Sequence, residues 1–412
     1  MVSYRWVILA VSTLAFMQVH LHRVGFAPLI PTFIEDLGLS YAAAGAIMTA
    51  YFWTYTVVQI PVGLLADRWG SRRVMIVFMA ILALGAIAFP LSQSYGQSLL
   101  SRALVGLGAA AVWVPSLRLI SEWFPAQERG WATGLLSAGG GLGGMLGLLL
   151  IPLLAEHWGW RIGYATTIGP ALLTLVLIAL FIRTSERGAH VETPGPSGRS
   201  LTAGPAHGGS LGGLWQVLAT PALWPLNVAV LLFYGAYFGL VTWIPTFLVR
   251  TLGLSQSQAG FVTSLVPAGS IVSWPLAGLL SDRLGRRKGI FLSSQVLACL
   301  GSLIFAWVVP GLSLWEAAVV ALGTGIVLGG MITPFVMAVE RFPRELAGTA
   351  TSVVNTFCFI GSLSIPVLLG RVVDLTGSFP AAFITAAAVQ ALAFVAAWFS
   401  RETGRGRRPL SA

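Results

Sequence analysis

Charged residues are scarce in this sequence. Only 9% of the 412 residues are Asp, Glu, Lys or Arg, whereas 56% are hydrophobic and the mean hydropathy is +0.83. Soluble domains carry roughly 25% charged residues, and a chain this apolar cannot cover a water-facing surface with polar groups. The composition therefore excludes an ordinary soluble protein and predicts a chain whose main solvent is lipid.

Cysteine and catalytic motifs are also nearly absent. Cys299 and Cys358 lie in separate apolar runs, which excludes a disulfide framework and a cysteine zinc site. We find no G-x-x-x-x-G-K-S/T phosphate loop, no Ser-His-Asp set and no cluster with metal-ligand spacing. We therefore expect no enzyme, no cofactor and no bound metal. The N-terminal apolar run has no small-residue cleavage site, so we expect it to be retained.

What the sequence has is a series of apolar segments. Twelve runs of about 20 residues are each long enough to cross ~30 Å of hydrocarbon. They cover residues 5–32, 41–66, 73–93, 98–121, 130–154, 162–182, 222–249, 257–280, 289–310, 314–339, 346–369 and 379–399. The interval 183–221 is rich in Gly, Pro and Ser and predicts a flexible linker. We predict an all-α membrane protein with six-helix bundles at 1–182 and 222–400 and a tail at 401–412.

The basic residues predict the orientation of these helices. If the N-terminus is cytoplasmic, all but six of the 24 Lys and Arg lie in loops on the cytoplasmic side. The exceptions are Arg23, Arg102, Arg118, Arg161, Arg250 and Arg371. The positive-inside rule then places both termini, the linker and the tail in the cytoplasm. The net charge of +10 thus reflects topology and anionic lipid, and we expect no nucleic-acid partner.

The two halves of the chain repeat. IPTFIEDLGLS (30–40) matches IPTFLVRTLGLS (244–255), and GLLADRWGSRR (63–73) matches GLLSDRLGRRK (278–288). EWFPAQERGWATG (122–134) matches ERFPRELAGTATS (340–352), with the offset between 214 and 218 residues throughout. Two six-helix units in the same orientation are related by an axis near the membrane normal. This arrangement predicts a substrate site between the halves, near mid-membrane.

These residues resemble the major facilitator superfamily over the whole chain. GLLADRWGSRR stands between the second and third helices, where that family has its G-x-L-a-D-r-x-G-r-r/k loop, and the weaker copy stands between the eighth and ninth. The resemblance implies twelve helices in two bundles, transport of a small molecule by alternating access, and a monomer in the cytoplasmic membrane.

The charges of this loop predict a cytoplasmic gate that holds the halves together in one conformation and releases them in the other. The alternative is that these charges only mark topology. The predicted gate residues are Asp67, Arg68, Arg72, Arg73, Glu122, Asp282, Arg283, Arg286 and Glu340.

The fourth segment narrows the resemblance to one branch. Arg102, Gly106 and Gly108 match the R-x-x-x-G-x-G-a-a pattern, and with WFPAQERGWATG they look most like the organic anion/cation symporters. That branch usually carries an acid before the arginine of the first helix, where this chain has His22, and a glutamate where it has Ala109. The drug/proton antiporter pattern G-P-x-x-G-G is also altered, since GGGLGG (139–144) has glycine in place of proline.

No carboxylate is predicted in mid-membrane, since all fourteen acids lie in loops or near helix ends. Arg23 therefore lacks a fixed acid at its depth, although burying an arginine costs roughly 2.5–3.5 kcal/mol on insertion scales. We expect Arg23 to face a water-filled cavity and to bind a mobile organic anion, since guanidinium suits carboxylate. The alternative is that Arg23 reaches outward or caps carbonyl groups.

Helical spacing predicts the neighbours of Arg23. Phe16, His20 and Phe26 share its face and are expected to line the cavity, while His22 points away. Arg102 either guides anions inward or holds structure. The remaining predicted substrate contacts are Trp113, Tyr234, Tyr237 and Asn355, each with packing as the alternative.

Proton coupling requires a group that titrates near neutral pH. His20 and His22 are the candidates, because an unperturbed histidine has a pKa of about 6.5. The alternative is a neutral His20 in a carrier that works by exchange or facilitated diffusion.

We predict from the sequence that the chain transports a small organic anion, with a carboxylate as the expected substrate. A drug or metabolite exporter with an aromatic cavity of Tyr51, Trp53 and Trp113 is the main alternative. A transporter-like receptor is a third hypothesis, which the short linker disfavours.

Overall fold

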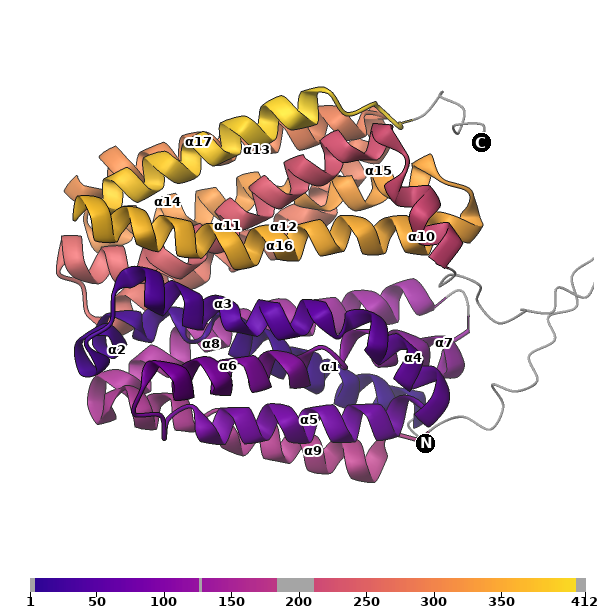
Figure 1. The fold of residues 1–412 in the computed structure, drawn as a ribbon, viewed down its shortest axis with the longest axis horizontal. Coiled ribbons are helices and arrows are strands. Elements are labelled where there is room, and N and C mark those ends of the chain that lie inside the picture. Colours follow the sequence, from indigo (N-terminus) through magenta and orange to yellow (C-terminus); the bar gives the residue numbers. More distant parts are fainter. Residues whose placement is uncertain (1–3, 126–127, 184–210, 405–412) are drawn as a thin grey trace, which may run out of the picture.

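The computed structural model describes residues 4–125, 128–183 and 211–404, and within these ranges it contains helices and no strands. The helices form two bundles that lie side by side (Figure 1). The N-half contains α1 (Tyr4–Val24), η1 (Ala27–Leu29), α2 (Ile30–Leu37), α3 (Tyr41–Val57), α4 (Gln59–Trp69), α5 (Ser71–Ala88), α6 (Tyr95–Ala109), α7 (Trp113–Trp123), α8 (Arg129–Ala165) and α9 (Ile168–Phe181). The C-half contains α10 (Leu211–Leu218), η3 (Pro221–Leu223), α11 (Trp224–Leu252), α12 (Gln256–Leu284), α13 (Arg287–Trp307), η4 (Val309–Gly311), α14 (Leu314–Val327), η5 (Leu328–Ile332), α15 (Thr333–Arg341), α16 (Arg344–Thr376) and α17 (Phe379–Trp398).

Ten stretches of the described chain are long and apolar enough to cross a membrane. One of them, Trp131–Phe181, contains two crossings, because Gly159 has φ 82° and turns the chain back on itself. A further crossing is formed by α3 and α4 together. Val58 separates the two helices, and each alone is too short to cross a membrane. The described residues thus supply the twelve predicted crossings.

Several crossings are broken near their middle, and glycine and proline explain where. After α1 ends at Val24, Gly25 and Pro28 interrupt the helix, since proline lacks the N–H that would continue the ladder. In the tenth crossing, α14 passes through η5 into α15, and the amide of Gly330 donates to Ser294 Oγ at 2.8 Å.

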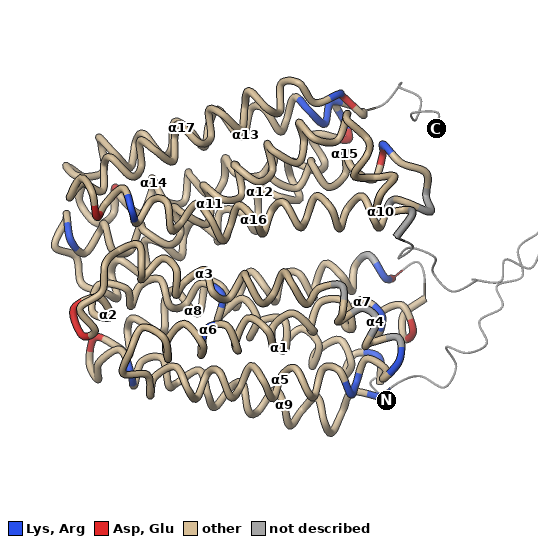
Figure 2. The backbone as a smooth tube through the Cα atoms, viewed as in Figure 1, with Lys and Arg blue, Asp and Glu red and all other residues tan. Residues whose placement is uncertain are grey.

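The two halves meet mainly along two helix pairs, α3 with α16 and α8 with α12. We call the end of the molecule where α1 begins and α17 finishes the terminal end, and the opposite end the far end (Figure 1). Most Lys and Arg gather at the terminal end, where several Asp and Glu also lie, and the far end carries fewer basic residues together with acidic ones (Figure 2).

Parts of the predicted linker and tail belong to the described residues. Helix α10 lies within the interval 183–221 that the sequence predicts as linker. Its side chains Leu214 and Val217 pack against the hydrophobic core, and this packing stabilises the helix. The Gly- and Pro-rich part of the linker, 184–210, lies outside the described residues. Of the tail, residues 401–404 are described. The Glu402 carboxylate accepts hydrogen bonds from the amides of Arg287 and Lys288, at the first turn of α13.

Candidate functional site

A cavity of about 930 Å³ lies between the two halves. It is lined by α1, α7 and α8 of the N-half and by α11, α12, η5, α15 and α16 of the C-half. Its wall extends to the terminal end through Ser281, Asp282 and Arg287, where α12 finishes and α13 begins. The position matches the site predicted between the repeats.

The far end of the molecule is closed by hydrogen bonds between the halves. The Asp374 carboxylate, near the end of α16, accepts from the amides of Tyr41 and Ala42 at 2.8 Å each. The Glu156 carboxylate of α8 accepts from the Ser257 amide at 3.1 Å. These carboxylates bind the exposed N–H groups at the starts of α3 and α12, where helix dipoles favour negative charge.

Two further contacts reinforce this closure. Gln256 Nε2 donates to Thr32 Oγ1 at 2.9 Å, and Arg250 pairs with Glu35 at 2.7 Å. Among the described ion pairs, this is the one that joins the halves. With the far end closed and the wall reaching the terminal end, the cavity opens toward the terminal end.

Arg23 lies in the cavity wall, on α1, with only 9% of its surface exposed. Among the described residues, no carboxylate forms an ion pair with it. Its Nε has no hydrogen-bond partner, and Nη1 lies 3.3 Å from His20 Nε2. The guanidinium carbon lies 5.2 to 5.9 Å from the ring centroids of Tyr51, Phe52, Tyr55 and Phe359. Aromatic faces stabilise the cation without neutralising it.

The contacts of His20 fit a neutral ring. Arginine only donates, so in its contact with Arg23 Nη1 the His20 Nε2 atom acts as the acceptor. A neutral His20 with its proton on Nδ1 can then donate to the carbonyl oxygen of Phe16, which lies 3.2 Å away. This second contact orients the ring toward Arg23.

Glycines of α8 leave room for the rings of Phe16 and His20, which α1 places against α8. A Cβ at Gly140 would lie 2.7 Å from Phe16 Cε1 and 2.9 Å from His20 Nδ1. A Cβ at Gly143 would collide with the carbonyl oxygen of Met17. The run GGGLGG thus brings α8 against α1, and Phe16 in turn packs on Trp113 with ring centroids 4.8 Å apart.

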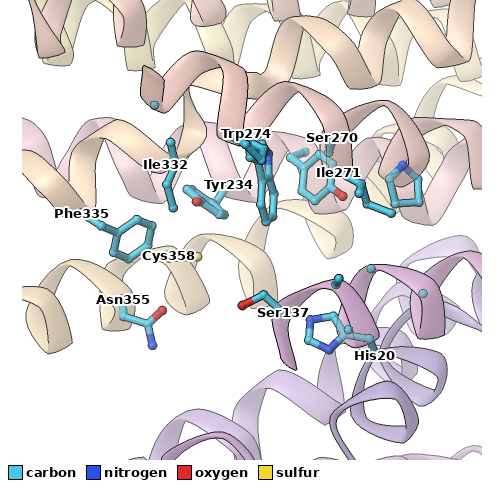
Figure 3. A pocket seen from close by; sticks show the side chains of 18 of the residues that line it. His20, Ser137, Tyr234, Ser270, Ile271, Trp274, Ile332, Phe335, Asn355 and Cys358 are labelled. Atoms are coloured by element: carbon cyan, nitrogen blue, oxygen red, sulfur yellow. The ribbon is translucent and has the colours of Figure 1, made fainter. Parts of the chain in front are cut away.

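The C-half supplies the opposite wall of the cavity. Tyr234 and Tyr237 lie on α11, and Asn355 lies on α16. Figure 3 shows Trp274, Tyr234, Phe335 and Asn355 across from His20 and Ser137 of the N-half. Tyr234 donates its hydroxyl proton to the carbonyl of Met331 at 3.0 Å. Hydrogen bonds from Tyr237 and Asn355 to other described residues are absent, so their polar groups are available to a ligand.

Phe26 and Arg102 do not line the cavity, contrary to the prediction. Both side chains are fully buried inside the N-half. Arg102 Nη1 donates to the carbonyl of His22 at 2.7 Å, and its guanidinium carbon lies 5.6 Å from the Phe26 ring centroid. The reason is the break after Val24, which turns Phe26 off the face of α1 and leaves carbonyl groups for Arg102 to cap.

His22 also lies away from the cavity, as its position on the helix predicted. Its side chain is fully buried, and Nδ1 lies 3.2 Å from the Tyr164 hydroxyl. Two residues of the predicted aromatic exporter cavity are likewise outside the wall. Trp53 is 57% exposed on the outer surface, and Tyr51 lies behind Arg23. Trp113 does line the cavity.

At the terminal end, every described ion pair of the predicted gate stays within one half. Glu122 pairs with Arg118, and Asp282 and Glu340 both pair with Arg287. Arg72 donates to the carbonyl of Ala179 at 2.6 Å, also within the N-half. Arg68, Arg73, Arg283 and Arg286 are exposed. The side chain of Asp67 lies outside the described part of the chain.

Sequence reasoning missed Arg287, Ser137, Trp274 and Phe359. The repeat offset of 215 residues between the two loop copies pointed to Arg287 as the counterpart of Arg72. No comparable signal marked the other three, because an apolar helix is hydrophobic on every face and hides the side that meets the cavity. No group of His, Cys, Asp or Glu suited to a metal occurs among the described residues.

Comparison with known proteins identifies related chains. The sequence model described as Major Facilitator Superfamily matches residues 8–255 and 247–412. The chain is 24% identical to a probable sulfoacetate transporter of Cupriavidus necator, over 97% of this chain and 94% of that protein. It is 28% identical to a probable galactarate/D-glucarate transporter of Bacillus subtilis, over 87% of this chain and 84% of that protein.

A solved structure shares the fold. The bacterial homologue of the human lysosomal transporter Spinster, in an inward-facing and unoccupied conformation, superposes with a TM-score of 0.81. The match covers 97% of this chain and 98% of that one at 18% identity. At this identity the likeness establishes the twelve-helix architecture.

Proposed function

Because this chain belongs to the major facilitator superfamily, we propose that it carries a small organic anion across the membrane by alternating access, with Arg23 as the anion-binding residue. The observation that carries the proposal is the guanidinium of Arg23, which lies in the cavity wall without a described carboxylate partner. A cation in such a place is costly unless a mobile anion compensates it.

The anion is a carboxylate or a group of similar shape. Guanidinium presents paired N–H donors that match two oxygens of one acid group. The names of the relatives support this class, since sulfoacetate, galactarate and glucarate are organic acids. The cavity walls come from both halves of a single chain, which supports a functional monomer.

The terminal end faces the cytoplasm and the far end faces outward. This orientation follows from the positive-inside rule, since Lys and Arg gather at the terminal end (Figure 2). The cavity is then open to the cytoplasm. The gate charges at the terminal end, each paired within its own half here, exchange partners across the halves when that end closes.

Transport is coupled to protons through His20. Neutral His20 accepts from Arg23, whereas protonated His20 has no lone pair left to accept with. Protonation therefore breaks this hydrogen bond, frees Nη1 of Arg23, and adds a positive charge beside the anion. Proton and anion then each raise the affinity for the other, which is the requirement for symport.

The anion proposal is tested by substrate counterflow in proteoliposomes with the purified protein. A panel of small carboxylates should compete, and the lipophilic cation tetraphenylphosphonium should not. Arg23→Gln should weaken carboxylate binding roughly 10- to 100-fold, the value of charge-assisted hydrogen bonds. Arg371→Gln is the matched control, because Arg371 is exposed on α16. Competition by the cation with equal activity of Arg23→Gln would support the exporter instead.

Proton coupling is tested separately, by proton uptake upon anion binding in weak buffer. The unaltered protein should take up about one proton per anion bound, as expected for one coupled histidine. The uptake should disappear in His20→Gln, which can still accept from Arg23 but does not titrate, and should persist in His22→Gln. Unchanged proton uptake in His20→Gln contradicts this part of the proposal.

A further inference from the structure

The cavity offers one free positive charge among the described residues. Its charged lining residues are Arg23, Asp282 and Arg287, with the last two at the terminal end. Arg287 is already occupied, since Nη1 pairs with Asp282 and Nη2 pairs with Glu340 at 3.0 Å. A substrate with two acid groups would place the second one against an apolar wall or beside Asp282.

Most hydroxyl groups in the wall already donate a hydrogen bond to a carbonyl group of the protein. Ser137 donates to the carbonyl of Thr133 at 2.9 Å, and Thr333 to that of Gly330 at 2.8 Å. Ser270 donates to the carbonyl of Val266 at 3.1 Å, as Tyr234 does to Met331. These groups can accept hydrogen bonds from a ligand, but they cannot donate to one without losing a bond.

The donors that remain are uncharged. Beyond Arg23, six side chains of the described wall carry an N–H or O–H for which no donated hydrogen bond is found: Trp113, Thr133, Tyr237, Trp274, Ser281 and Asn355. Trp113 and Thr133 lie in the N-half, on α7 and α8, and the other four lie in the C-half. None of the six carries a positive charge, so the second carboxylate of a sugar diacid would exchange its hydrogen bonds to water for neutral donors alone.

Aromatic and aliphatic side chains form much of the remaining wall. Phe16 and Trp113 line the N-half, and Tyr234 and Phe335 meet edge to face on the C-half with centroids 6.0 Å apart. Phe238, Phe359 and Trp274 also line the wall, as do the aliphatic residues Ile271 and Ile332. Figure 3 shows Trp274, Ile332 and Phe335 on the C-half side of the cavity. Such a wall favours an apolar body and offers ring faces and edges for stacking.

We infer that the substrate is a monoanion with an apolar, ring-containing body: its single acid group binds Arg23 and its ring lies between Trp113 and the Phe335 side of the cavity. The inference rests on the proposed anion transport and makes it more specific. It also separates this chain from the two relatives described above, whose names denote substrates with two acid groups.

The test is binding to the purified, unaltered protein, measured by calorimetry with three probes. 3-Phenylpropionate should bind, while its amide and D-glucarate should bind at least about tenfold more weakly, as expected when a charged hydrogen bond or a polar group is left unpaired. If D-glucarate binds more tightly and Arg23→Gln abolishes it, the inference is wrong and the anion proposal stands. If the amide equals the acid and Arg23→Gln changes nothing, both are wrong.

A pair of variants tests the location of the ring. Phe335→Leu should weaken 3-phenylpropionate binding by roughly three- to tenfold, the value of an aromatic contact, and should weaken hexanoate binding less, because leucine keeps an apolar surface for an aliphatic chain. Trp53→Leu removes an exposed ring on the outer surface and should change neither. Equal losses for the aromatic and the aliphatic acid in Phe335→Leu would overturn the assigned ring position.

Discussion

Two arginines in the interior of the N-half, Arg23 and Arg102, are held in different ways. Both guanidinium carbons lie 5.6 Å from the ring centroid of Tyr51, so both arginines contact the same aromatic ring. Arg102 is fully buried and donates to the carbonyl of His22, where α1 approaches its break. Arg23 has no carbonyl partner and meets the cavity. The difference supports a structural role for Arg102 and the proposed ligand-binding role of Arg23.

Arg102→Gln should therefore lower the thermal stability of the protein while changing anion affinity little in the folded fraction. The loss should be about 1.5–3 kcal/mol, because the carbonyl of His22 loses a charged hydrogen-bond donor in a buried place. Thermal unfolding and ligand titration of the same preparation check this. A large loss of affinity at unchanged stability would instead place Arg102 on the anion path.

At the scale of single helices, glycine decides how closely α8 approaches α1. Gly143 faces the backbone of Met17, and Gly140 faces the side chains of Phe16 and His20. A Cβ added at Gly144 would lie 3.7 Å from Val24 Cγ2, which is an ordinary contact distance. The three positions lie within five residues of one helix and differ in what an added methyl group would displace.

An alanine series along α8 should separate packing from binding. Gly143→Ala should lower thermal stability, because backbone cannot move aside cheaply. Gly140→Ala should leave the fold intact and weaken anion binding about tenfold, because it shifts His20 and with it the hydrogen bond to Arg23. Gly144→Ala is the control and should change neither quantity. Equal effects of all three on stability would show that the helix as a whole, and not the contact, is responsible.

Helix α13 is capped by a residue far along the chain. Burial alone raises the pKa of the Glu402 carboxyl, but backbone amides of Gly404, Lys288, Arg287 and Thr403 donate to it and the net pKa lies below its usual range. The charged form is thus favoured by folding. Its contribution to stability is complete at neutral pH and is lost as the pH falls through the folded-state pKa.

Glu402→Gln should accordingly destabilise the protein at neutral pH by about 1 kcal/mol, the usual value of a lost helix cap. The difference from the unaltered protein should shrink on acidification, because the natural carboxyl is then protonated as well. Thermal unfolding across a pH series measures this. A difference that stays constant at acid pH would show that charge at Glu402 has no part in it.

At the scale of the whole molecule, the closure of the far end follows the internal repeat. Asp374 binds the start of α3 in the opposite half, and Glu156 binds the start of α12 in the same way. The offset from Glu156 to Asp374 is 218 residues, within the range of the sequence repeat. Each half therefore supplies one carboxylate and receives one, and in the proposed alternating-access cycle both contacts break when the far end opens.

Asp374→Asn combined with Glu156→Gln should shift the population toward a conformation open at the far end. The shift should be roughly tenfold or more, from the loss of two charge-assisted hydrogen-bonded contacts. Spin labels at Gln93 and Leu375, exposed at the far end on opposite halves, should report a longer distance.

Glu316→Gln is the control for this double variant. Glu316 accepts hydrogen bonds from Ser313 within the C-half, at the same end of the molecule, and joins nothing across the halves. An equal change in the distance distribution for Glu316→Gln would mean that charge at the far end, and not the inter-half bond, governs the closure.

The sequence by itself determined the lipid solvent, the twelve crossings, the two repeated halves and the isolation of Arg23 from acids, because each is a property of composition or of spacing along one chain. Only the tertiary structure decided which end is closed, that Arg102 caps α1 instead of facing the cavity, and that Arg287 gathers Asp282 and Glu340. These outcomes depend on where helices break and which faces meet. In helices that are apolar on every side, the face that turns toward a neighbouring helix is decided by contacts between residues far apart in the chain.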